Sequence, residues 1–272
     1  MISIGMSLKL SQVARNWARL SWLAWVKAVL ATFVIPPAAA LLLARIFHLS
    51  WGSTVGLFMV GVAPGAPLLT RNLAKRGFDM HLAASYQVWA ALMIPLMVPL
   101  VVAAGGKFYS RNVWISPLLL LWQIVLKQLL PLALGVAIAW MVPRPLKRVQ
   151  VVLNVVGNGV LTVSIAFALF RLGPLLKTLT PLVPLAALLL AVVSIVAVRL
   201  LETSDVLVKQ TFAICNANRH VGLALLLVGP YPVGRMAIPE IACYAALAPF
   251  VMLAYVKIYA PRREAALLSA TR

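Results

Sequence analysis

About eight apolar runs, each long enough to cross the hydrocarbon core of a bilayer, constrain this chain more than any other feature. Short basic connections separate the runs, and no low-complexity linker or soluble domain lies between them. The fold class that we expect is therefore an all-α polytopic membrane protein with about eight transmembrane helices. The predicted spans are Leu23–Ala44, Ser53–Ala74, Met80–Ala104, Trp114–Val142, Val149–Phe170, Leu182–Leu201, Val206–Val228 and Met236–Tyr259.

The composition supports a membrane protein and argues against a soluble domain or a nucleic-acid-binding protein. Hydrophobic residues make up 63% of the 272 residues and charged residues only 11%. The mean hydropathy of +1.01 does not fit a soluble domain. A formal net charge of +19 could indicate nucleic acid, but the basic residues stand singly or in pairs between apolar runs. They form no stripe, so we expect a lipid bilayer rather than nucleic acid as the surrounding partner.

The basic residues also predict the orientation. Loops on the side of the N-terminus carry about twice as many Lys and Arg residues as the opposite loops. Cytoplasmic loops hold the excess of positive charge, so both termini should lie in the cytoplasm. We expect an integral protein of a bacterial inner membrane.

No enzyme or metal signature is present. The sequence has no HExxH or GxSxG motif and no paired intramembrane aspartates, and its three histidines are scattered. The two cysteines, Cys215 and Cys243, lie inside apolar runs and are expected to be buried thiols. We therefore expect no catalytic residues, no cofactor and no metal.

A Pro-Gly sequence interrupts the second predicted span. Pro64, Gly65 and Pro67 fall where a membrane helix should run unbroken. Proline removes backbone donors and frees carbonyls that lipid cannot satisfy. Broken helices at this depth mark the substrate site in secondary transporters, although a proline-kinked structural helix is an equally good interpretation. The residues that follow, Thr70, Arg71 and Asn72, form a small polar cluster.

A denser polar cluster lies inside the seventh predicted span. The cluster consists of Asn216, Asn218, Arg219 and His220, with Gly222 just beyond it. Exposure of these side chains to lipid would be costly, since arginine alone costs roughly 2.5 kcal/mol at a helix centre. One interpretation is an unwound crossover that lines a polar site. The other is a loop between two short helices. Together with the Pro-Gly break, the cluster indicates paired, crossing discontinuous helices, as in inverted-repeat transporters.

Several segments resemble the bile acid:sodium symporter superfamily. Gly61–Asp79, with Pro95 and Pro99 beyond it, is similar to the family's fourth and fifth helices. Ile124–Gly135 resembles the sixth helix, and Cys215–Leu223 resembles the crossover of the ninth. Ile4–Leu10 resembles the end of the second helix. Compared with ten-helix members of the family, we therefore expect the first helix and most of the second to be missing from this sequence, either because the start used here is not the natural one or because the protein works with a reduced panel or a partner chain, or has lost transport.

The resemblance implies a core domain with two crossing broken helices and a panel domain that moves against it. Organic anions would bind between the domains, and sodium ions would sit behind the crossover. The implied division is an N-terminal stub (1–20), core helices (21–105), panel-like helices (113–172), further core helices (180–260) and a cytoplasmic tail (261–272).

The chain departs from the family at its sodium ligands. The family's Glu falls on Cys215, its Gln on Arg219 and its Asn on His220. The Ser-Asn pair falls on Leu69 and Thr70, the fifth-helix Ser and Thr on Ala83 and Gln87, and the third-helix Gln on Thr32. A hard cation needs oxygen ligands and is repelled by an adjacent guanidinium. We therefore predict no sodium coupling through these positions.

A positively charged crossover could hold an anion instead. Arg219 would bind a carboxylate, sulfonate or phosphate, and His220 would carry a coupling proton. Alternatively, Arg219 pairs with Glu240 and holds the helices together; Arg235 is the other candidate partner of Glu240. The candidate substrate-binding residues are Thr70, Arg71, Asn72, Gln87, Asn216, Asn218, Arg219 and His220.

The function that we expect is a secondary transporter or facilitator of small organic anions. The alternative is a non-transporting, receptor-like or degenerate relative that binds a ligand without turnover. The spans permit a homodimer, but none carries a GxxxG pattern that would predict one.

Overall fold

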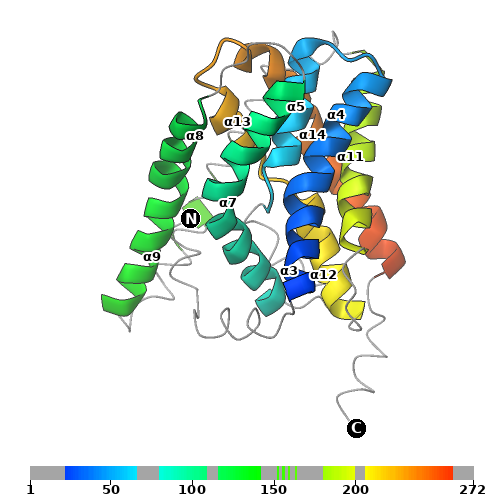
Figure 1. Ribbon diagram of the computed structural model, residues 1–272. Helices are drawn as coiled ribbons and strands as arrows, with labels where there is room; N and C mark the ends of the chain where they lie inside the picture. Colours follow the sequence, from blue (N-terminus) through cyan, green and yellow to red (C-terminus); the bar gives the residue numbers. More distant parts are fainter. Residues whose placement is uncertain are drawn as a thin grey trace.

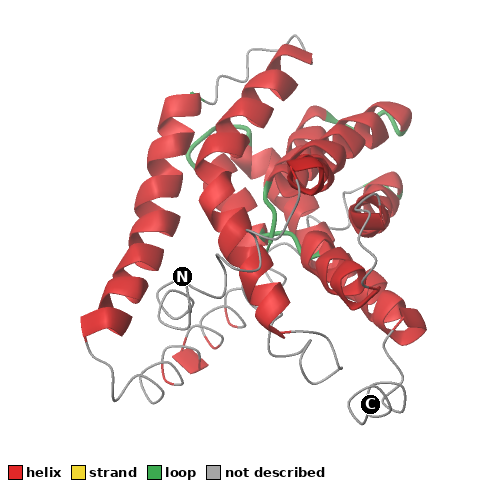
Figure 2. Ribbon diagram, turned by 60° about the horizontal axis from the view of Figure 1, so that its bottom comes forward, coloured by secondary structure: helices red, strands yellow, loops and turns green. Residues whose placement is uncertain are grey.

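A computed structural model gives the arrangement of the helices (Figure 1). It describes residues 22–65, 80–108, 116–141, 180–199 and 206–259, with isolated positions between 152 and 163. In these ranges the ordered elements are helices, with no strand, and they make eight continuous helical segments (Figure 2).

Two of the segments contain a π-helical turn. The first consists of α3 (Trp22–Val29), η1 (Leu30–Val34) and α4 (Ile35–Ile46), and another of α8 (Pro117–Ile124), η2 (Val125–Leu129) and α9 (Leu130–Met141). The other six are α5 (Trp51–Val62), α7 (Met80–Phe108), α11 (Leu182–Arg199), α12 (Val206–Ala217), α13 (Val221–Val228) and α14 (Gly234–Tyr259).

Five stretches of the described chain are long and apolar enough to cross a membrane, which indicates an integral membrane protein. They are Trp22–Ile46, Ser85–Gly106, Leu182–Arg199, Val208–Val228 and Gly234–Tyr259. Two shorter apolar helices, Trp51–Val62 and Leu118–Lys127, match the second and fourth predicted spans in part. The predicted span Val149–Phe170 lies outside the continuously described ranges.

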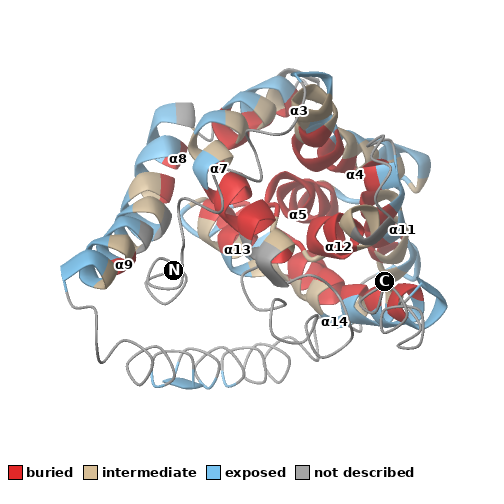
Figure 3. Cartoon of the chain, turned by 90° about the horizontal axis from the view of Figure 1, so that it is seen from below, coloured by how far each residue is buried: buried red, intermediate tan, exposed pale blue. Residues whose placement is uncertain are grey.

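The helix α5 lies at the centre of the bundle, and every residue from Gly52 to Val62 is buried. It packs against α4 on one side and α14 on the other, and α11 packs against both α4 and α14. Figure 3 shows buried residues on α5 and α12 in the middle and exposed ones on the outer side of α8 and α9. The exposed side chains of α8 and α9 are mostly apolar, including Leu118, Trp122 and Trp140, as expected for a surface that faces lipid.

Both predicted breaks coincide with helix ends. α5 stops at Val62, and Gly65 follows with a φ of +63°, a left-handed conformation that favours glycine. The seventh predicted span is divided by residues 218–220 into α12 and α13. Gly222 was predicted to be part of the break, but it lies inside the first turn of α13, since the helix begins at Val221.

Candidate functional site at the two helix breaks

Two backbone carbonyls inside the first span lose their helical donors. In η1 the N–H of Ile35 donates to the carbonyl of Leu30, five residues back, so the carbonyl of Ala31 has no helical partner. Pro36 has no N–H to donate to Thr32, four residues back. Both carbonyls belong to buried residues. A buried carbonyl without a donor is costly in a membrane, so this turn requires polar side chains from elsewhere.

The predicted polar cluster supplies those donors. Asn216 donates through Nδ2 to the carbonyl of Ala31 at 3.0 Å, and Arg219 donates through Nη1 to the carbonyl of Thr32 at 3.0 Å. Asn216 Nδ2 also donates to the carbonyl of Ser194 on α11 at 2.7 Å. The end of α12 is therefore joined to the first span and to α11.

A tyrosine on α7 completes this network. The hydroxyl of Tyr86 donates to Oδ1 of Asn216 at 3.0 Å and lies 3.2 Å from the hydroxyl of Thr32. Because Tyr86 gives its proton to Asn216, Thr32 must be the donor of the second bond. Asn216 is fully buried and has all of its polar atoms in use, so it is a fixed structural element of the break.

The guanidinium of Arg219 is enclosed by neutral oxygens. Nη2 donates to Oδ1 of Asn216 at 3.2 Å and contacts Oγ of Ser194 at 3.5 Å. Arg219 is only 2% exposed, and its Nε has no hydrogen-bond partner. Its acceptors carry no formal charge, so the site keeps a net positive charge within the described part of the chain.

The two breaks are joined directly through their backbones. The N–H of His220 donates to the carbonyl of Ala63 at 2.9 Å, just beyond the end of α5. His220 also caps α13, since its Nδ1 accepts from the N–H of Leu223 at 3.0 Å. Nδ1 is therefore unprotonated, and a proton added there would break the cap. His220 is consequently poorly placed to carry the coupling proton that we expected.

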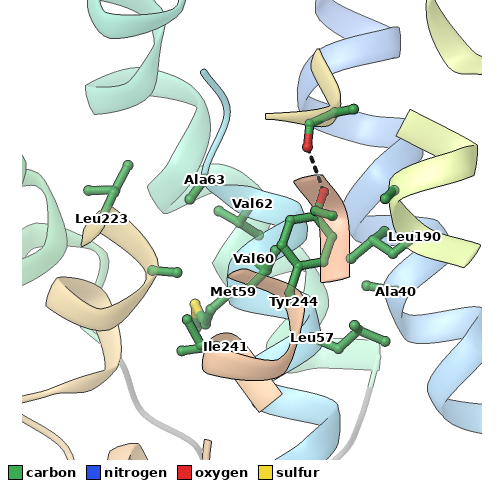
Figure 4. Close-up of a cluster of buried hydrophobic side chains, with 14 of the residues drawn as sticks. Ala40, Leu57, Met59, Val60, Val62, Ala63, Leu190, Leu223, Ile241 and Tyr244 are labelled. Carbon is green, nitrogen blue, oxygen red and sulfur yellow. Dashed lines mark hydrogen bonds between the residues drawn. The ribbon is translucent and has the colours of Figure 1, made fainter. Parts of the chain in front are cut away.

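A tyrosine on α14 also binds the end of α12. The hydroxyl of Tyr244 donates to the carbonyl of Ala217, the last residue of α12, at 2.7 Å. Figure 4 shows Tyr244 among buried apolar side chains that include Val60, Leu190 and Ile241, with its hydrogen bond drawn as a dashed line. This bond satisfies one carbonyl at the open end of α12.

Glu240 does not pair with Arg219 or Arg235, contrary to one of our expectations. Its Oε1 accepts a 2.6 Å hydrogen bond from Ser53 on α5, and its Oε2 has no partner. Both terminal nitrogens of Arg219 contact acceptors on η1, α11 and α12. Arg235 is exposed at the start of α14. Arg219 still holds helices together, but its partners are the carbonyl of Thr32 and the side chains of Ser194 and Asn216 rather than Glu240.

The other candidate residues are only partly placed. Gln87 is buried on α7, next to Tyr86, and Asn218 is half-buried between α12 and α13. Pro64 and Gly65 lie beside α7, since a Cβ on Gly65 would contact Ala90 and Tyr86 at 3.5 and 3.6 Å. The remaining predicted residues, Pro67, Thr70, Arg71 and Asn72, lie outside the described residues.

Several residues of the network were absent from the predicted site. Tyr86, Ser194, Tyr244 and Ser53 each look like an isolated polar residue in an apolar helix. A clearer signal was Pro36, because a proline inside a span always frees the carbonyl four residues earlier. Searching for the donor that satisfies this carbonyl would have drawn attention to the polar residues of neighbouring spans.

No group of three His, Cys, Asp or Glu side chains that could hold a metal occurs in the part of the chain that the structure describes. The carbonyl of Thr32, the hydroxyl of Ser194 and the amide oxygen of Asn216 already accept from Arg219. Neither a scan against protein-family models nor a search of curated proteins finds a match for this chain.

Proposed function

We propose that this chain is a secondary transporter or facilitator of small organic anions, built on two discontinuous helices that cross inside the membrane. The observation that supports the proposal is the hydrogen bond from His220 to Ala63, which joins the gap between α12 and α13 to the residue that follows the end of α5. Interruptions of this kind weaken a membrane helix and persist where they line a site. This arrangement supports an inverted-repeat transporter architecture.

Charge at the crossover favours an anion as the substrate. Arg219 contributes a guanidinium that has no carboxylate partner among the described residues, and α13 directs its positive N-terminal end to the same place. Gly222 in the first turn of α13 is exposed, so the backbone there is accessible. Helix N-termini and unpaired positive charge both stabilise carboxylates, sulfonates and phosphates. Because Arg219 is buried, it acts in this proposal through its field rather than by direct contact.

The same geometry supports independence from sodium. The guanidinium of Arg219 already occupies the oxygens that a monovalent cation would need behind the crossover. A second positive charge at this place would be repelled strongly in a medium of low dielectric constant. The resemblance to sodium symporters is therefore proposed to extend to the architecture and to the class of substrate, but not to the coupling ion.

One observation favours a second candidate function. Because Asn216 and both terminal nitrogens of Arg219 are engaged by internal acceptors, the crossover resembles a fixed joint. A non-transporting membrane protein that binds a ligand without turnover would tolerate such a joint. This candidate predicts ligand binding without flux across the bilayer.

Thermal unfolding of the purified protein tests the proposal without a known substrate. The protein is heated with small carboxylates, sulfonates or phosphates, and with neutral amides of the same shape as controls. Each compound is tested in sodium and in choline buffers at two pH values. An anion that binds only the folded state at about a hundred times its Kd stabilises the protein by about 2.7 kcal/mol. We expect an anion-specific rise that is the same in both buffers. A rise with sodium alone, or with the neutral amides equally, would contradict the proposal.

A further inference from the structure

Glu240 is a buried acid that the proposed anion site does not use. It is the only acidic residue in the described part of the chain and is 3% exposed. Its Oε1 accepts from the hydroxyl of Ser53, whereas Oε2 is buried and has no hydrogen-bond partner. An ionised carboxylate in this place would keep one oxygen without any donor, which is far more costly than a neutral acid.

Among the described residues, the elements packed against Glu240 offer no cation that bonds to it. α5 and α13 contain no titratable residue. α11 carries only Arg199, in its last turn, where the guanidinium lies 5.0 Å over the ring of Tyr259 at the far end of α14. The titratable residues of the neighbouring α12 and of α14 itself are Lys209, Cys215, Arg235, Cys243, Tyr244, Tyr255, Lys257 and Tyr259, and none of them is bonded to Glu240.

Close packing keeps water away from the carboxyl group. A Cβ on Gly56 of α5 would lie 2.6 Å from the carbonyl oxygen of Ala237 and 2.8 Å from Cβ of Glu240. One turn earlier, a Cβ on Gly52 would lie 2.6 Å from Met236. The two helices therefore approach each other as closely as backbones allow, so there is no room beside Glu240 for a solvation shell.

A short chain of hydroxyl groups connects Glu240 to the surface. The hydroxyl of Ser53 lies 2.9 Å from that of Ser50, which is exposed at the N-terminus of α5. Ser53 in turn donates to Glu240 at 2.6 Å. Glu240 lies six residues into α14, or about 9 Å along the helix axis. Two serines therefore bridge the distance between solvent and the buried acid.

We propose that Glu240 is a proton-binding site that is protonated in this packed state and exchanges with solvent through Ser53 and Ser50. In uptake, Ser53 gives its hydroxyl proton to Oε1, Ser50 gives its proton to Ser53, and a proton from solvent replaces that of Ser50. The protonated Oε1 then donates to Ser53 across the same 2.6 Å contact, and Ser53 donates to Ser50. Release reverses these three transfers and leaves a carboxylate. Charging Glu240 then requires α5 and α14 to separate enough to admit water.

The position of Glu240 on α14 links the proton to the crossover. One turn further along the same helix, Tyr244 holds the carbonyl of Ala217 at the end of α12. A movement of α14 away from α5 therefore acts on the break between α12 and α13. If the proposed transport function holds, the proton on Glu240 is the coupling ion. The protonation of Glu240 itself does not depend on that function.

Infrared difference spectroscopy of the full chain in lipid tests this inference without any substrate. The carbonyl stretch of a protonated carboxyl group is expected at neutral pH in the unaltered protein and should be lost in Glu240→Gln. Ser53→Ala removes the hydrogen bond to Oε1, so it should move the band to higher frequency. Thr54→Val is the matched control, because it removes a buried hydroxyl of α5 that bonds only to the carbonyl of Ser50. It should leave the band in place.

A second measurement follows the same band after transfer to heavy water. Transfer to heavy water should shift the protonated-carboxyl band through exchange, and Ser53→Ala should slow that exchange. Absence of the band at neutral pH, or a band that is unchanged in Glu240→Gln, would overturn the inference. If the band is present while no anion stabilises the protein, the proton site stands and the proposed transport function fails.

Discussion

Arg219 shows how a single charged residue can be retained inside a membrane bundle. It is almost fully buried, yet each of its terminal nitrogens reaches an oxygen, including the carbonyl that Pro36 leaves without a donor. Burial of a charge is costly, but removal of the donor would leave a buried carbonyl unsatisfied. The residue therefore stabilises the crossover and also leaves a positive charge there.

Replacement of this residue should destabilise the protein. Arg219→Gln keeps one amide donor but is too short to reach all of the acceptors on η1, α11 and α12. At about 0.6 kcal/mol for each hydrogen bond in a membrane protein, with an added cost for the orphaned carbonyl, we expect a loss of about 2 kcal/mol in unfolding free energy. Denaturant unfolding in mixed micelles measures it.

The matched control is Arg235→Gln, since Arg235 is exposed on α14. It should change the unfolding free energy by less than about 0.5 kcal/mol. Equal stability of the two variants would contradict the structural role of Arg219. Loss of anion binding in Arg219→Gln alone would then assign the residue to the anion site only.

At the scale of elements, the first span and the broken seventh span depend on each other. The π-helical turn η1 and Pro36 expose carbonyls, and the end of α12 provides the donors. Neither feature is favourable alone: a proline in a span leaves an orphan carbonyl, and an Asn-x-x-Arg sequence needs acceptors. Close contact reinforces the joint, because a Cβ on Gly61 of α5 would lie 2.9 Å from Cα of Pro37.

This dependence predicts an energetic coupling between Pro36 and Arg219. Pro36→Ala restores an N–H that can donate to the carbonyl of Thr32 in place of Arg219. The loss caused by Arg219→Gln should therefore be smaller in the Pro36→Ala background, with a coupling of about 1 kcal/mol. A double-mutant cycle by denaturant unfolding measures it, and additive losses would contradict the interpretation. Pro37→Ala, at the adjacent proline, provides the control.

At the scale of the whole molecule, the apolar stretches indicate a membrane protein. The positive charge of Arg219 is the reason that we propose an anion as its substrate. Five stretches of the described chain can span a bilayer, and the most buried helix, α5, is one of the two that end at a break. The proposed anion site has Arg219 at its centre, whereas Glu240 bonds to Ser53 on α5 and shares no hydrogen bond with Arg219. Anion and proton would then occupy separate places.

Flux of an anion in proteoliposomes should be independent of sodium. Once a stabilising anion is identified, we expect the same uptake rate in sodium and in choline, within about a factor of two, because Arg219 occupies the oxygens a cation would need. Radiolabelled uptake with both salts at equal ionic strength measures this. Uptake that requires sodium would refute the proposed cation independence, whereas binding without any uptake would favour the non-transporting candidate.

Much of the architecture follows from the sequence because its causes are local. Runs of apolar residues predict the helices to within a few residues, as for Met80–Phe108 and Gly234–Tyr259. Proline and glycine predict the end of α5, and clustered polar residues predict the gap after Ala217. These features depend only on residues that are neighbours along the chain: on their hydropathy, on the N–H group that proline lacks and on the backbone freedom of glycine.

Only the tertiary structure decided which polar groups meet. The carbonyl of Thr32 and the guanidinium of Arg219 are 187 residues apart in sequence, as are Ser53 and Glu240. Opposite charge predicted Arg219 with Glu240, but charge alone carries no information about which helix faces are in contact. Packing of α5 against α14 brought the acid to a serine, and packing of both α12 and the first span against α11 brought the arginine to the carbonyl of Thr32. In a bundle, pairing follows from how helices are arranged, because hydrogen bonds act only over contact distance.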